Sequence, residues 1–210
     1  MDVSASLVGR HVRLEPLSHA HAAGLLAAAS EARDSFAFTF VPDDAAAVAD
    51  YIDHALKEAA TDRALPFATV DSTGRVVGST RLYNFERWTW TPHAPPEPTP
   101  LGPDAVELGF TWLAPSAQRT AVNSEAKLLL LGHAFDAWRV RRVTLKTDAR
   151  NQRSRTAIAR LGCHFDGVWR AHMAASDGTV RDTAFFSLLR DEWPAARERL
   201  AARLRDHATR

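Results

Sequence analysis

The chain has 210 residues, of which 46% are hydrophobic and 24% are charged, and its formal net charge is +1. This composition fits one globular domain over residues 1–210 that buries a substantial core. The basic residues are spread along the chain and form no concentrated stripe that would bind a phosphate backbone, so nucleic acid is not expected as a partner.

Cysteine, histidine and the apolar runs exclude further classes of protein. The one cysteine, Cys163, excludes an internal disulfide and a multi-cysteine metal site, and the nine histidines are scattered, so no metal is expected. No apolar run approaches the ~20 residues that span a membrane, and the first residues lack the pattern of a signal peptide. We therefore expect a cytoplasmic protein without membrane contact.

Two helices and three strands are predicted in the first part of the chain. Alternating apolar residues predict a strand over residues 11–17, and residues 18–29 open with a serine N-cap and continue as an Ala- and Leu-rich helix. Apolar residues at helical spacing predict a second helix over residues 42–61. Residues 67–70 and 76–83 are typical of antiparallel strands joined by a turn.

Residues 85–104 interrupt this order as an inserted loop. Six of these 20 residues are proline, and Trp88 and Trp90 lie in the same segment. Proline has no N–H to donate and so does not fit the interior of a sheet. Two indoles in such a loop would be exposed to water unless they pack against another surface. We expect the loop to fold over a substrate cleft or to contact a partner subunit, and the latter would make a homodimer.

Regular elements resume at residue 105 and continue to the end of the chain. Strand, helix and strand patterns that follow one another predict a parallel pair of strands with a helical crossover. The complete order predicts an α/β fold with a mixed central sheet and helices on both faces. The predicted elements are strands over residues 105–113, 143–147, 164–174 and 180–189, and helices over residues 124–138, 151–161 and 191–207.

Several motifs stand in register along the chain and resemble the RimJ/RimL-like branch of the GNAT superfamily of N-acetyltransferases. The resemblance covers nearly the whole chain, and it implies the GNAT fold, in which two parallel strands splay apart and acetyl-CoA binds between them. The motifs that carry it are residues 107–113, 123–127, 146–154 and 161–162, together with the opening segment 9–17 and the late segments 177–182 and 191–194.

The resemblance also implies which residues bind the cofactor. The pantetheine arm would follow the strand that ends in Trp112 and Leu113, and the pyrophosphate would lie on the amides of the next helix start, where free N–H groups and the helix dipole favour an anion. Asn151 and Ser154 would complete the site near the sulfur. The residues of the phosphate loop are Gln118, Arg119, Thr120, Ala121, Val122 and Asn123.

This loop contains no glycine, although the family usually has glycine there. Arg119 stands at the first glycine position and Ala121 at the second. The Arg119 side chain either blocks close approach of the phosphates, reaches them as a charged fork, or faces solvent.

The resemblance suggests two catalytic residues. Ser154 could protonate the departing thiolate, or it and Asn151 could simply satisfy the first amides of a helix. Glu107 could take a proton from the incoming amine, or it could form a structural salt bridge. His172 is a reserve candidate for the base. Cys163, with no evident His partner, is expected to pack as a small apolar residue.

These residues predict an N-acetyltransferase that moves the acetyl group of acetyl-CoA directly to an amine in a ternary complex. The acceptor would be a protein or peptide N-terminus or a small-molecule amine. The alternative is a GNAT-fold binding or regulatory protein that has lost catalysis, which the glycine-free loop suggests. The core is expected to contain the aromatic residues Trp112, Phe135, Trp138, Phe165 and Phe186.

Overall fold

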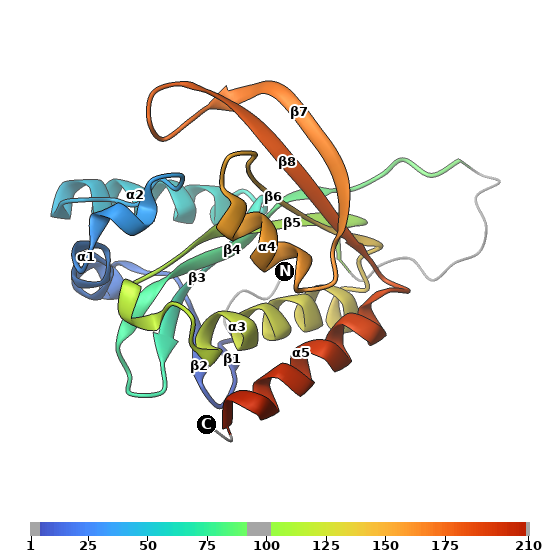
Figure 1. Ribbon diagram of the computed structural model, residues 1–210, viewed down its shortest axis with the longest axis horizontal. Helices are drawn as coiled ribbons and strands as arrows, with labels where there is room; N and C mark the ends of the chain where they lie inside the picture. The colour runs from blue at the N-terminus through green and yellow to red at the C-terminus, as the bar shows by residue number, and fades with distance from the viewer. Residues whose placement is uncertain (1–4, 92–101, 209–210) are drawn as a thin grey trace.

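The computed structural model describes residues 5–91 and 102–208, and these residues form an eight-stranded mixed sheet (Figure 1). The strand order is β1-β2-β3-β4-β5-β6-β8-β7, and neighbouring strands are antiparallel except for the parallel pair β5 and β6. The strands are β1 (Leu7–Val8), β2 (Val12–Pro16), β3 (Ala64–Asp71), β4 (Val76–Glu86), β5 (Ala105–Leu113), β6 (Arg142–Asp148), β7 (His164–Ala174) and β8 (Val180–Leu189).

Helices cover both faces of this sheet. Figure 1 shows α1 and α2 together on one side and α3 and α5 on the other, and α3 packs directly against α5. The helices are α1 (Ala22–Ser30), α2 (Ala45–Ala60), α3 (Ala121–Gly132), α4 (Gln152–Ala159) and α5 (Trp193–Ala208), with a π-helical turn over His133–Ala137 and 3-10 turns over His19–His21, Arg33–Phe36 and Pro115–Ala117. The predicted α/β architecture is confirmed.

Most predicted elements form where the sequence placed them. The strand β1 was not predicted, α2 begins at Ala45 and not at residue 42, and the start of α3 differs as well. The prediction of a helix from residue 124 was wrong, because α3 begins at Ala121. Thr120 has extended backbone and its hydroxyl accepts a hydrogen bond from the Val122 N–H, so it is the N-cap. Asn123, which the sequence placed in the preceding loop, therefore lies in the first helical turn.

The core follows the apolar patterns closely, with one exception. The stripe of α2 is buried, as are Trp112, Phe135, Trp138 and Phe186. Phe165 was expected in the core as well, but 44% of it is exposed. Its strand, β7, is the last in the sheet and pairs only with β8, so no further strand covers it.

The inserted loop is described only at its two ends. Residues 92–101 lie outside the described residues, so the prediction that they form a loop, and the prediction of a single domain, stay predictions. Trp88 donates from its indole to Glu86 and Trp90 donates to Asp104. Both rings also lie against arginine side chains of the β6 region, so both indoles contact the body of the protein.

A buried glutamate fixes α3 to the turn between β1 and β2. The Glu125 carboxylate accepts hydrogen bonds from the backbone N–H groups of Arg10, His11 and Val12, at 2.9, 2.5 and 2.9 Å. A Cβ on Gly9 would lie 2.4 Å from the Glu125 carboxyl carbon, so glycine allows this close approach. These bonds set where the N-terminal end of α3 meets the sheet.

Across the part of the chain that the structure describes, no helix has both the length and the apolar character needed to cross a membrane.

Candidate functional site

The parallel pair β5 and β6 stays together for only three residue pairs, Ala105 with Arg142, Val106 with Val143 and Glu107 with Thr144. Beyond them β6 continues to Asp148 in register with β8 only, and β5 continues to Leu113 in register with β4 only. The two strands therefore separate, and the facing edges of their backbones have no strand partner there.

A β-bulge in β5 accompanies this separation. The register between β4 and β5 shifts between Ser79 and Arg81, where one β4 residue lies opposite two β5 residues, Phe110 and Thr111. Phe110 has a φ of +49°, in the left-handed region. A bulge bends its strand and increases the local twist, which explains why β5 leaves β6 at this point.

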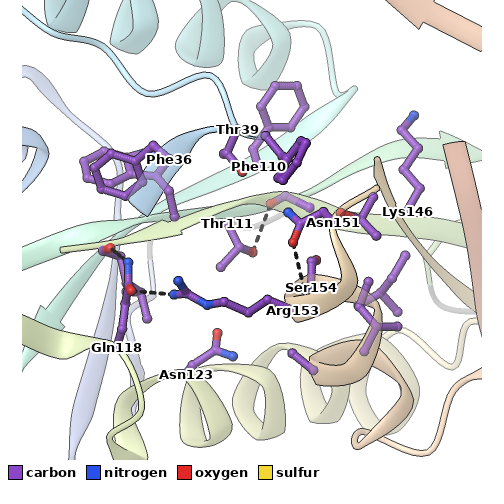
Figure 2. A pocket seen from close by; sticks show the side chains of 18 of the residues that line it. Phe36, Thr39, Phe110, Thr111, Gln118, Asn123, Lys146, Asn151, Arg153 and Ser154 are labelled. Atoms are coloured by element: carbon purple, nitrogen blue, oxygen red, sulfur yellow. Dashed lines mark hydrogen bonds between the residues drawn. The ribbon is translucent and has the colours of Figure 1, made fainter. Parts of the chain in front are cut away.

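A cavity of about 1050 Å³ opens where the strands separate. Its walls come from β5, β6, the loop over residues 34–40, the N-terminal ends of α3 and α4, and the start of β8. Figure 2 shows Gln118 and Asn123 near α3, Asn151, Arg153 and Ser154 near α4, and Phe36, Thr39 and Phe110 on the far side. A volume of this size accommodates a cofactor together with a small acceptor.

The structure brings most of the predicted cofactor-binding residues to this cavity, and it leaves others out. Ala121 and Val122 do not line it, because they are the first two residues of α3 and are buried. Glu107 does not line it either. The residues that do are Trp112, Leu113, Gln118, Arg119, Thr120, Asn123, Asn151 and Ser154.

Arg119 holds the conformation that explains why glycine is usual at its position. Its φ is +63°, in the left-handed region, where a residue with a Cβ is strained by about 1–2 kcal/mol. The neighbouring Gln118 stabilises the loop, since its amide donates to the Leu113 carbonyl at 2.8 Å and its oxygen accepts from Arg153. The loop thus keeps a glycine-type turn without glycine.

At the start of α4 the two predicted residues have different environments. The Asn151 side chain accepts a hydrogen bond from the Ser154 N–H at 3.0 Å, so Asn151 is the N-cap of this helix. The Ser154 hydroxyl makes no hydrogen bond to any residue that the structure describes, and Ser154 lines the cavity. The expectation that this hydroxyl also satisfies a helix amide is therefore wrong.

Glu107 lies behind the cavity wall in a hydrogen-bonded cluster. It is 4% exposed, it accepts from the Tyr83 hydroxyl, and the Lys146 amine lies 3.1 Å from its carboxylate. The prediction that Glu107 could form a structural salt bridge is confirmed. Tyr83 and Lys146 both line the cavity. Burial, together with the charge of Glu107, raises the pKa of Tyr83, so its phenol stays protonated.

The two remaining candidates do not reach the cavity. His172 packs against Trp169 and Phe185 and lies 3.1 Å from the Thr183 hydroxyl, and burial lowers its pKa. Cys163 is buried, and burial raises the pKa of its thiol to about 12. A thiol of this kind stays protonated near neutral pH and is a poor nucleophile.

The sequence analysis missed Lys127, which lines the same cavity. Lys127 is buried, and its amine donates to the hydroxyls of Thr111 at 2.5 Å and Thr80 at 3.4 Å. No carboxylate among the described residues pairs with it, and burial lowers its pKa to about 7. A signal existed, because Lys127 lies four residues after Asn123, on the same face of the helix.

Arg181, at the start of β8, was also missed and lines the cavity as well. Within the described residues, no cluster of three or more His, Cys, Asp or Glu side chains is arranged to hold a metal ion.

In the described residues, the one parallel pair of a mixed α/β sheet opens into a cavity with two helix N-termini at its edge, an arrangement suited to an extended anionic ligand. A family model described as an acetyltransferase (GNAT) domain matches residues 11–164 of this chain. The chain belongs to the GNAT family and is an N-acetyltransferase, which confirms the resemblance seen in its motifs.

Solved structures support this assignment. A GCN5-related N-acetyltransferase from Brucella melitensis is 32% identical with a TM-score of 0.79, and the match covers 96% of this chain and 86% of that chain. RimJ from Mycobacterium smegmatis, in complex with CoA-disulfide, is 21% identical with a TM-score of 0.75, covering 91% and 88%. The ribosomal-protein-S5-alanine acetyltransferase from Vibrio fischeri is 17% identical with a TM-score of 0.68, covering 90% and 98%.

The likenesses to RimJ and to the ribosomal-protein-S5-alanine acetyltransferase show only that the fold is shared. A search of the curated proteins found no match to this sequence.

The lowered pKa of Lys127 predicts a specific pH dependence of stability. The ordinary pKa of lysine is 10.5, so between about pH 7 and 10.5 the unfolded chain holds a proton at Lys127 that the folded protein does not. The contribution of this residue to stability therefore rises with pH, by at most about 1.4 kcal/mol per pH unit, and is flat below pH 7. Lys127→Met should remove the effect.

Urea unfolding at pH 7, 8 and 9 measures this difference. The stability advantage of Lys127→Met over the natural protein should shrink as the pH rises, whereas Lys57→Met, at an exposed helix position, should show no such trend. A Lys127→Met advantage that is the same at all three pH values would contradict the assignment of a neutral buried amine.

Proposed function

We propose that this protein transfers the acetyl group of acetyl-CoA directly to a primary amine bound in the same cavity. The observation that carries the proposal is the cavity between the separated strands β5 and β6, lined by the helix starts of α3 and α4, in a chain of the GNAT family. GNAT enzymes use acetyl-CoA as the acetyl donor.

The cofactor would lie along the free edge of β5. Its pantetheine amides would pair with the β5 backbone near Trp112 and Leu113, which have no β6 partner. Its pyrophosphate would lie on the amides of residues 118–123, where the macrodipole of α3 favours an anion. Further positive charge at the cavity comes from Arg119, Arg153, Arg160 and Arg203, which all line it.

In the transfer step the amine nitrogen would attack the thioester carbonyl carbon. A nitrogen–carbon bond forms, the carbon–sulfur bond breaks, and the thiolate of CoA leaves. Backbone amides at the cleft would stabilise the oxyanion. The unbonded Ser154 hydroxyl would protonate the thiolate, and Glu107 would accept the amine proton through Tyr83 or through an ordered water.

We further propose that the protein belongs to the RimJ/RimL-like branch and acts in the cytoplasm, with a protein N-terminus as one class of acceptor. The structural likeness to RimJ and to a ribosomal-protein-S5-alanine acetyltransferase supports this choice. The alternative of an inactive binding protein is not favoured, because the glycine-free loop still forms the wall of an open cavity.

Acetyl-CoA should stabilise the folded protein. A ligand that binds only the native state adds about 2.7 kcal/mol at 100 times its dissociation constant, which raises the melting temperature of a chain of this size by several degrees. Thermal unfolding with and without millimolar acetyl-CoA measures this shift. An unchanged melting temperature would contradict the cofactor assignment, and strain or blockage at Arg119 would be the first cause to test.

Ser154→Ala should lower kcat by about 100-fold to 10,000-fold with little change in acetyl-CoA affinity, because the hydroxyl acts only in the transition state. The matched control is Asn151→Ala, which removes the helix cap and should cost about 0.5–2 kcal/mol of stability. Kinetics and melting curves for both variants separate the two roles. A Ser154→Ala protein with natural kcat would exclude Ser154 as the general acid.

A further inference from the structure

Arg181 is an unpaired arginine in the wall of the active-site cavity. It is the second residue of β8 and lines the cavity, and its guanidinium makes no hydrogen bond to any residue that the structure describes. Its Nε atom is buried as well. A buried donor without a partner is unfavourable, and more so when it belongs to a charged group.

The carboxylates whose charges act on Arg181 are already bonded to other groups. Asp148 accepts from the Arg150 side chain at 2.8 and 3.0 Å, and Glu107 accepts from Tyr83 and Lys146. Both acids act on Arg181 only through their charge. The Arg181 guanidinium is therefore available to an anion that the described residues do not supply.

Strand pairing places Arg181 on the same face of the sheet as the Tyr83–Glu107–Lys146 cluster. Residues paired across strands share a face, as do alternate residues along a strand. Lys146 and Asp148 thus share a face, Asp148 pairs with Thr183, and Arg181 lies two residues before Thr183. The charge of Arg181 also acts on Tyr83, in agreement with this placement.

The proposed binding site for the cofactor phosphates lies in another part of the cavity. The loop that would bind them precedes α3, and the α3 side chain Lys127 reaches Thr80 and Thr111. Thr80 and Tyr83 are three positions apart on β4 and so project from opposite faces. Arg181 thus lies on the face opposite to α3, where an acceptor rather than the pyrophosphate would bind.

Apolar side chains also line this cavity. Phe40, Phe110 and Met173 line the cavity and are 70%, 44% and 44% exposed. Met173 is the cross-strand partner of Arg181. An acceptor that pairs an apolar group with an anion would contact both kinds of side chain.

We propose that Arg181 binds an anionic group of the acceptor, so that the preferred acceptors are amines that carry a carboxylate or a phosphate close to the amino group. This inference rests on the proposed acetyl transfer and narrows its acceptors, because a protein N-terminus would be preferred only where its first residues supply an anionic side chain. The guanidinium would hold the anion through paired N–H···O bonds and would position the amine near Tyr83 and Glu107.

Matched acceptor pairs test the inference with acetyl-CoA as donor. Phenylalanine and phenylalaninamide share the amine and the ring and differ in the carboxylate, and O-phosphoethanolamine and ethanolamine differ in the phosphate. Kinetics would be measured for the natural protein, Arg181→Gln, Arg181→Lys and the control Arg170→Gln, which alters an exposed β7 arginine that does not line the cavity. Calorimetry with CoA-loaded protein would measure acceptor binding independently of turnover.

The anionic member of at least one pair should have the higher kcat/KM and the tighter binding. Arg181→Gln should lower both by about 10-fold to 100-fold for the anionic acceptor only, as expected for lost hydrogen bonds to a charged group. Arg181→Lys should recover part of the loss, and Arg170→Gln should match the natural protein. The pair that responds distinguishes carboxylate from phosphate.

The inference would be overturned by no preference for the anionic member of either pair, or by an equal loss for both members in Arg181→Gln. Weaker acetyl-CoA binding in Arg181→Gln, with acceptor preference unchanged, would assign Arg181 to the cofactor instead. If no amine is acetylated but the anionic acceptors still bind through Arg181, the anion site stands and the proposed transfer fails.

Discussion

The short parallel contact between β5 and β6 is the constraint on which the site depends. Three residue pairs hold the strands together, and beyond Glu107 and Thr144 each strand pairs only with its antiparallel neighbour. The bulge at Phe110 produces the divergence, and the antiparallel neighbours keep both strands in the sheet after they part. The cavity is thus built from backbone that the sheet itself leaves unpaired.

Two of the six non-glycine residues with positive φ in the described part of the chain lie at this opening. Phe110 and Arg119 both have positive φ, and both line the cavity. Phe110 is held by the Tyr83 ring, at a centroid distance of 4.9 Å, and by the Arg81 guanidinium at 4.0 Å. Strained residues persist where their surroundings fix them, and they cluster at functional sites. The loop at Arg119 therefore keeps the turn that a glycine would give, and its side chain adds positive charge at the cavity.

The sequence predicted seven of the eight strands and most helices because their apolar periods are clear, and the motifs located the start of α4, which borders the cavity. It placed the start of α3 at residue 124, whereas Thr120 is the N-cap, and residue type alone does not separate two good caps such as serine and threonine. It could not identify β7 as the edge strand of the sheet, and for this reason the exposure of Phe165 was not predicted. Lys127 and Arg181 were missed because burial without an acidic partner is a property of the folded chain.

The central claim is that the opening between β5 and β6 holds acetyl-CoA. A crystal structure of the protein with CoA tests it most directly. We expect the pantetheine arm along β5 beyond Glu107 and the pyrophosphate on the amides that precede and begin α3. CoA bound at another surface, or a cleft that stays empty at saturating CoA, would contradict the account.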